Sequence, residues 1–129
     1  MAQGDGAAAT FRALLVNVDH ITGALLTTVL EEQGFDLTYV SSSTAYETLD
    51  KNVSQLGALV VDVDTGGITG FEIAHYARLR NPAVSVIFLS GAHRDSVEKF
   101  GVSGAAHVTK PFDPDLLVMI LRALAASVG

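Results

Sequence analysis

Short apolar runs alternate along the chain with longer segments whose apolar residues recur at helical spacing. The runs are bounded by polar or turn-forming residues and are too short for helices, which indicates buried strands. Because they are apolar at nearly every position, we expect these strands to be covered on both faces, as in a parallel sheet. The runs cover residues 11–18, 37–40, 59–61, 84–89 and 105–109.

A helical segment follows each apolar run. Apolar residues recur at helical spacing from Ile21 to Leu30, and Gly34 follows as a C-terminal stop. The Thr44–Glu47 segment fits a capping box that opens the second helix, and Asp113 precedes the last helix as an N-cap. The predicted helices cover residues 21–33, 44–52, 71–80, 95–100 and 114–127.

This alternation of strands and helices predicts a doubly wound α/β fold. Right-handed crossovers favour a five-stranded parallel sheet with helices on both faces, a flavodoxin-like (βα)5 arrangement. In one common strand order, 2-1-3-4-5, the carboxyl ends of strands 1 and 3 lie side by side and line a crevice. We therefore expect the functional groups of this chain at the carboxyl ends of its strands.

Composition narrows the class of protein further. The 129 residues suit one domain, which we expect over residues 11–129 after a flexible Gly- and Ala-rich tail at residues 1–10. A net charge of −6 argues against a nucleic-acid partner, and no apolar stretch is long enough to suggest a membrane span. The chain has no cysteine, which agrees with a cytoplasmic location.

Three reactive groups stand just past predicted strands. Asp62 follows the third apolar run, Ser90 the fourth, and Lys110 the fifth. The carboxyl ends of neighbouring parallel strands line one crevice, so these side chains are expected to meet. A carboxylate nucleophile, a hydroxyl donor and a cation are the groups needed to move a phosphoryl group onto aspartate.

In this order and on these strand ends, Asp62, Ser90 and Lys110-Pro111-Phe112 resemble the receiver domain of two-component response regulators, the CheY-like superfamily. The resemblance covers roughly residues 11–128, and Gly70 with Phe71-Glu72 also fits the family pattern. It implies a signalling module, not an enzyme. In such a module, Asp62 would accept a phosphoryl group from a histidine kinase or phosphotransfer protein. Lys110 and Ser90 would bind that group, and the bond before Pro111 would be cis.

The resemblance also implies a switch residue and a metal. His107 stands where the family usually has a rotating Tyr or Phe, although a packing role is the simpler interpretation of this histidine alone. Receivers carry an acidic pair that binds Mg²⁺ at the end of strand 1, where this chain has Asn17 and Val18. Valine cannot coordinate a metal, so the presence of Mg²⁺ stays open. The candidate metal ligands are Asp62, Asp64, Asp19 and Asn17; for Asp19, an N-cap of the first helix is the simpler interpretation.

Two alternatives remain. The missing acidic pair, together with Gly66 and Thr69 in place of the family's usual loop residues, favours an atypical receiver-like module that binds partners without phosphorylation. The segment from Leu59 to Thr65 also fits the aspartyl-nucleophile motif of haloacid-dehalogenase-type phosphatases, with Asp64 as general acid. That motif normally lies on the first strand, and here it lies on the third.

The last helix suggests an output surface. Residues 116–121 are apolar all round, and a helix on a sheet needs only one apolar stripe, so Leu116, Met119 or both are expected to face solvent. In receivers, the face formed by the fourth helix, fifth strand and fifth helix is the usual place for dimerisation or effector docking. We expect a homodimer or an effector protein there. Whether the chain is a whole regulator or part of a longer one stays open.

Overall fold

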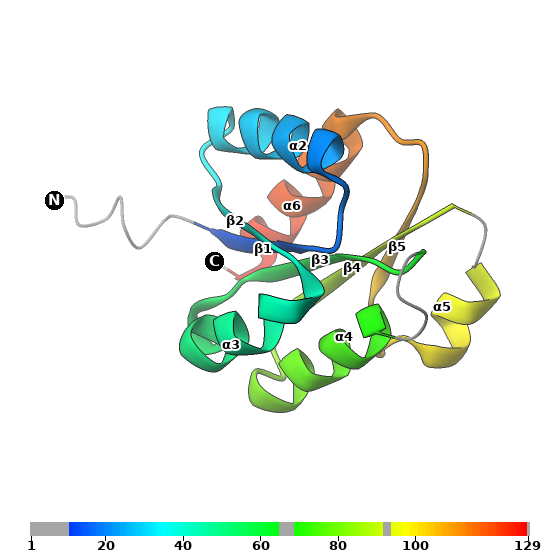
Figure 1. Ribbon diagram of the computed structural model, residues 1–129. Coiled ribbons are helices and arrows are strands. Elements are labelled where there is room, and N and C mark those ends of the chain that lie inside the picture. Colours follow the sequence, from blue (N-terminus) through cyan, green and yellow to red (C-terminus); the bar gives the residue numbers. More distant parts are fainter. Residues whose placement is uncertain (1–10, 65–68, 92–93, 129) are drawn as a thin grey trace, which may run out of the picture.

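The apolar runs form the five strands of one parallel sheet, covered by helices on both faces (Figure 1). This computed structural model describes residues 11–64, 69–91 and 94–128. The strands are β1 (Arg12–Val16), β2 (Asp36–Val40), β3 (Ala58–Asp62), β4 (Ser85–Ser90) and β5 (Ala106–Thr109). The helices are α2 (His20–Glu32), α3 (Ser42–Asn52), α4 (Thr69–Arg80), α5 (Arg94–Phe100) and α6 (Pro114–Val128), with a short 3₁₀ helix at Val53–Gln55.

The strand order is β2-β1-β3-β4-β5, so the predicted doubly wound sheet is confirmed. All neighbouring strands pair in parallel. Val16 of β1 is opposite Val61 of β3, and Ser90 of β4 is opposite Thr109 of β5. This register brings Asp62 and Ser90 to the carboxyl edge of the sheet, with Lys110 directly after β5.

Each face of the sheet has its own apolar core. Helices α2 and α6 cover one face, and α3, α4 and α5 cover the other (Figure 1). Alternate residues of each strand point to opposite faces, so Leu14 belongs to one core and Leu15 to the other. The largest fully buried side chain is Phe88 of β4, on the face of α3, α4 and α5. The two cores hold the strand ends rigidly at the edge that carries the reactive groups.

Two sequence-based details need correction. The capping box predicted at Thr44–Glu47 is wrong, because α3 begins earlier, at Ser42, with Ser41 as its N-cap. The Ser41 hydroxyl makes no capping bond and lies 2.9 Å from the Ser43 hydroxyl, while the Thr44 hydroxyl donates to the Ser41 carbonyl. The helical spacing of apolar residues also suggests that Ile21 belongs to the buried face of α2, but its side chain is 82% exposed.

Other expectations about helix ends and faces are confirmed. Asp113 Oδ1 accepts the backbone N–H of Asp115 at the start of α6, and Gly34 follows α2 with φ of 93°. Leu116 and Met119 face solvent, with 42% and 67% of their surface exposed. Among the described residues, no helix combines the length and apolar character needed to span a bilayer.

Candidate functional site

Asp62 ends β3 and is nearly buried, with 5% of its surface exposed. Its Oδ1 accepts the backbone N–H of Asp64 at 2.8 Å, and its Oδ2 lies 2.6 Å from Lys110 Nζ. A buried carboxylate is costly unless it is paired and hydrogen-bonded, and both oxygens of Asp62 meet that condition. The structure therefore presents a fixed, charged carboxylate at the carboxyl edge of the sheet.

Lys110 reaches Asp62 from the end of β5. Its backbone N–H donates to the Ser90 carbonyl at 2.9 Å, which ties the end of β5 to β4. The Lys110–Pro111 bond is cis, as the resemblance implied. The Lys110 ammonium also lies 2.8 Å from Asp64 Oδ2 and so bridges two carboxylates. Burial lowers the pKa of Lys110, but the hydrogen bonds to Asp62 and Asp64 outweigh it, so its pKa lies above the ordinary value.

Asp64 joins three strand ends. Besides Lys110 from β5, it binds the end of β4, since the backbone N–H of Gly91 donates to Asp64 Oδ2 at 2.8 Å. Burial raises the pKa of Asp64, but the bonds from Lys110 and Gly91, with a smaller contribution from the Ser90 hydroxyl, lower it more, so its pKa lies below the usual value. The sequence predicts Asp64 as a candidate metal ligand, but it does not predict Gly91, which contributes a backbone N–H that residue type does not reveal.

The lowered pKa of Asp64 predicts how its contribution to the free energy of unfolding changes with pH. The pKa of Asp64 is lowered by folding, so its stabilisation is present above its ordinary pKa of 3.8 and disappears as pH falls through the lower folded value. We expect Asp64→Asn to lower the free energy of unfolding at pH 7 and to differ little from the wild type near pH 2. Urea unfolding of both proteins at the two pH values measures this. An equal difference at both would show that the Asp64 charge contributes nothing.

Ser90 and His107 lie on the same part of the sheet but on different strands. Ser90 is fully buried at the end of β4. His107 lies on β5 opposite Phe88 and is half-buried. Its Nε2 is enclosed and has no hydrogen-bond partner among the described residues. Buried polar groups usually have a hydrogen-bond partner, and an ordered water or a turn of the ring would supply one here.

Gly70 lies where α4 packs against the acceptor strand. A Cβ at this position would lie 2.9 Å from the Asp62 carbonyl oxygen and 2.9 Å from Val63 Cγ1, closer than real Cβ atoms come. The lack of a side chain therefore lets α4 start directly against the backbone of Asp62. Gly66, also singled out from the sequence, lies outside the described residues, whereas Thr69 begins α4.

The end of β1 does not supply the carboxylates that Mg²⁺ binding in the family requires. Val18 is 4% exposed and packs in the core on the face of α2 and α6. Asp19 is the N-cap of α2, where its Oδ2 accepts the Thr22 N–H at 3.2 Å. Asn17, in a left-handed conformation with φ of 69°, offers at most an amide oxygen. The described residues contain no cluster of three or more His, Cys, Asp or Glu side chains suited to a metal. This donor set does not fit the family's Mg²⁺ site.

The capping role of Asp19 leads to a prediction. Asp19→Ala removes the acceptor for the Thr22 N–H, and loss of an N-cap typically costs about 1 kcal/mol of stability. We expect a modest fall in the urea midpoint and unchanged chemistry at Asp62. Asp19→Asn, which keeps a capping oxygen, is the matched control and should restore the midpoint. If Asp19→Ala instead prevented modification of Asp62, Asp19 would belong to the site.

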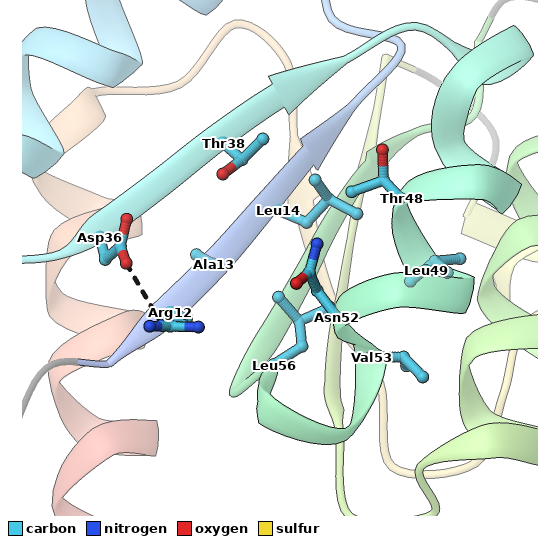
Figure 2. A pocket seen from close by; sticks show the side chains of 10 residues that line it. All are labelled: Arg12, Ala13, Leu14, Asp36, Thr38, Thr48, Leu49, Asn52, Val53 and Leu56. Carbon is cyan, nitrogen blue, oxygen red and sulfur yellow. Dashed lines mark ion pairs between the residues drawn. The ribbon is translucent and has the colours of Figure 1, made fainter. Parts of the chain in front are cut away.

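A separate cavity of about 220 Å³ lies at the opposite, amino end of the strands, between α3 and the edge formed by β1 and β2 (Figure 2). An ion pair spans its mouth, with Arg12 Nε 3.3 Å from Asp36 Oδ2. Both residues begin their strands, whereas Asp62 ends one. This cavity is therefore not part of the site around Asp62.

Comparison with known proteins agrees with this geometry. The model of the response regulator receiver domain family matches residues 13–122. A curated relative, the probable transcriptional regulatory protein TcrX of Mycobacterium tuberculosis, is 25% identical over 131 residues, covering 100% of this chain and 55% of the relative. The chain thus spans about half the length of that relative.

Solved structures show the same fold. A response regulator receiver protein from Sinorhizobium medicae superposes with a TM-score of 0.81 at 24% identity, over 91% of this chain and 95% of the other. A putative response regulator from Chloroflexus aurantiacus gives 0.75 at 25% identity, over 91% and 98%. The chemotaxis protein CheY4 of Vibrio cholerae gives 0.74 at 19% identity, over 89% and 98%.

Proposed function

The chain belongs to the response regulator receiver domain family of two-component signalling, and from that premise we propose that it accepts a phosphoryl group on Asp62 and thereby switches a protein-interaction face. The observation that carries this proposal is the buried Asp62 carboxylate with the Lys110 ammonium 2.6 Å away. Members of this family are signalling domains and are generally not true enzymes. The phosphatase alternative therefore has no support beyond the short motif around Asp62.

Each group around Asp62 has a role in this proposal. One Asp62 oxygen attacks the phosphorus of the donor, while the backbone N–H of Asp64 holds the other in place. Lys110 balances the charge of the incoming oxygens, as a fixed cation does in phosphoryl transfer. The Ser90 hydroxyl, at the end of the neighbouring strand, turns toward the phosphoryl group once it is attached. Pro111, after the cis bond, sets the direction in which the chain leaves Lys110.

Receiver domains interact with histidine kinases and with effector domains, and the surface beside Lys110 suits the donor. A largely apolar groove lies between the start of α2 and the segment after β5, lined by Leu25, Lys110 and Phe112 among others. Exposed Ile21 precedes Thr22, a lining residue of this groove, on the same helix. We propose that the histidine kinase or phosphotransfer protein docks here, because its phosphohistidine must reach Asp62 past Lys110. A cytoplasmic location remains a prediction from composition.

We propose that the output face is formed by α5, β5 and α6. Leu116 and Met119 are exposed on α6, and His107, whose Nε2 has no hydrogen-bond partner among the described residues, lies on β5. Exposed apolar side chains that cluster are better explained by a partner than by chance. A second copy of the chain or an effector protein would cover them when Asp62 is modified.

A substitution at Met119 tests whether the face formed by α5, β5 and α6 mediates self-association. Met119→Glu places a charge at the more exposed of the two apolar side chains Leu116 and Met119, so we expect self-association at high concentration to be lost while folding is kept. Light scattering over a concentration series, with and without phosphoramidate, measures the effect. Glu72→Gln, an exposed site on α4, is the control and should associate like the wild type. A wild type that stays monomeric in both conditions would exclude the homodimer.

A second candidate function has a specific observation in its favour. Val18 is buried in the core where the family has a metal-binding carboxylate, which suits a receiver-like module that binds its partner without phosphorylation. One experiment separates the two functions. The protein is incubated with phosphoramidate or acetyl phosphate and its intact mass recorded; a phosphoryl adduct supports the first function, and its absence supports the second.

A further inference from the structure

We propose that the pocket around Asp62 takes up its phosphoryl group without a divalent metal ion, and that the Lys110 ammonium, held between Asp62 and Asp64, is its resident cation. This inference rests on the proposed function and adds how the pocket balances the charge of the incoming group. Three features of the described residues carry it: the set of oxygen donors, the place of Lys110, and the sum of charges.

The end of β1 lacks the carboxylate ligands with which the family holds Mg²⁺. Mg²⁺ requires near-octahedral oxygen coordination. At the end of β1, Val18 supplies only a hydrocarbon side chain, enclosed in the core on the face of α2 and α6, and the carboxylate of Asp19 caps α2. Two carboxylates, Asp62 and Asp64, therefore remain, and both already bind another cation.

That other cation is Lys110, which lies between the two carboxylates. Its Nζ is 2.6 Å from Asp62 Oδ2 and 2.8 Å from Asp64 Oδ2. Asp64 is held in turn by the N–H of Gly91, so the carboxylate that orients Lys110 is fixed to the end of β4. A metal ion bridging the same two oxygens would have to displace the ammonium from between them.

The sum of charges shows that the pocket is less negative than it would be with a carboxylate at position 18. Asp62 and Asp64 carry one negative charge each and Lys110 one positive charge, so the pocket has a net charge of −1. A further carboxylate at position 18 would bring it to −2 and would require an additional cation before an anionic donor approached. Replacement of that carboxylate by Val18 thus removes both a metal ligand and the charge that the metal would neutralise.

The transfer itself balances without a metal. With phosphoramidate, an Asp62 oxygen forms a bond to phosphorus while the P–N bond breaks and its electron pair leaves with ammonia. The donor nitrogen is already protonated, so no general acid is required, and the Asp62 carboxylate has no proton for a general base to remove. The acyl phosphate then carries the charge of both reactants, and Lys110 moves from Asp64 to the phosphoryl oxygens. Asp64 keeps the Gly91 N–H, so modification loosens the link between β5 and the end of β4.

The test compares the rate of adduct formation by intact mass in two buffers, one with excess EDTA and one with millimolar Mg²⁺. We expect the same rate in both. An adduct that forms only with Mg²⁺ would overturn this inference and leave the proposed function standing. No adduct in either buffer would overturn the proposed function, and this inference with it.

A readout that needs no phosphorylation completes the test. We expect Mg²⁺ to produce no binding heat in calorimetry and no shift in the melting temperature of the wild type. Val18→Asp restores a carboxylate, and we expect it to gain a melting shift with Mg²⁺ and a rate that depends on Mg²⁺. Because the decisive comparison uses the wild type, the test stands even if that variant folds poorly. Binding heat in the wild type that disappears in Asp64→Asn would contradict the inference.

Discussion

Asp62→Asn is expected to abolish the phosphoryl adduct completely. The substitution keeps the size and shape of the side chain but replaces a charged oxygen nucleophile with an amide, which does not attack phosphorus at a useful rate. The Asp62 oxygens are placed by the Asp64 N–H and by Lys110, so the geometry around the new side chain should change little. Intact mass after incubation with phosphoramidate measures the loss.

Asp115→Asn is the matched control for this result. Asp115 is an exposed carboxylate in the first turn of α6, and it contributes only its backbone N–H to the cap made by Asp113. The same change of acid to amide there should leave the adduct at the wild-type level. An adduct that persists in Asp62→Asn at the wild-type level would mean that another carboxylate is modified, and the role proposed for Asp62 would be wrong.

Phe88→Ala is expected to lower the free energy of unfolding by about 3–5 kcal/mol, the usual cost of removing a fully buried aromatic side chain. The Phe88 ring is completely enclosed, lies 5.3 Å from the Phe71 ring on α4, and touches the backbone at Gly101 so closely that a Cβ there would meet it at 2.9 Å. Alanine at this position leaves a cavity in the core on the face of α3, α4 and α5. Urea unfolding measures the loss.

Phe100→Ala is the control for the core prediction. This ring also contacts Phe71, at 5.9 Å, but it lies at the surface and is partly exposed. We expect its removal to cost clearly less than the removal of Phe88. If the two variants lost equal stability, the core between the sheet and α4 would not be centred on Phe88.

The strands were predictable because they are apolar at nearly every position, and a parallel sheet follows from their alternation with helices. Helix starts were harder. Residue type alone predicts the cap at Asp113, whereas the four consecutive hydroxyl residues at positions 41–44 all suit an N-cap, so residue type does not separate Ser41 from Thr44. The exposure of Ile21 was also hidden, because spacing shows that a helix has an apolar face but not where the sheet ends beneath it.

The site was predictable where side chains carry its chemistry. Asp62, Ser90 and Lys110 were found from their positions after apolar runs, and the structure brings Asp62 and Lys110 into contact. The bond from the Gly91 N–H to Asp64 was not predictable, because every residue except proline offers a backbone N–H. The bridging of Asp62 and Asp64 by Lys110 depends on where a long side chain comes to rest, which residue spacing does not determine.

Val18 determines the charge and the metal ligands proposed for the pocket. Its side chain reduces the negative charge around Asp62 and takes away a metal ligand, so Lys110 becomes the main source of positive charge. Asp64 then has a double effect: it orients Lys110 before the reaction, and it competes with the phosphoryl group for the same ammonium afterward. A pocket of this kind would respond to phosphorylation through the strand ends of β4 and β5.

Locating the phosphoryl group on the chain tests directly whether Asp62 is the acceptor. After incubation with phosphoramidate, borohydride reduction converts an aspartyl phosphate to homoserine, and tandem mass spectrometry of the peptides then identifies the modified residue. We expect homoserine at position 62 and at no other acidic residue. Homoserine at position 64 or elsewhere, with Asp62 unchanged, would contradict this expectation.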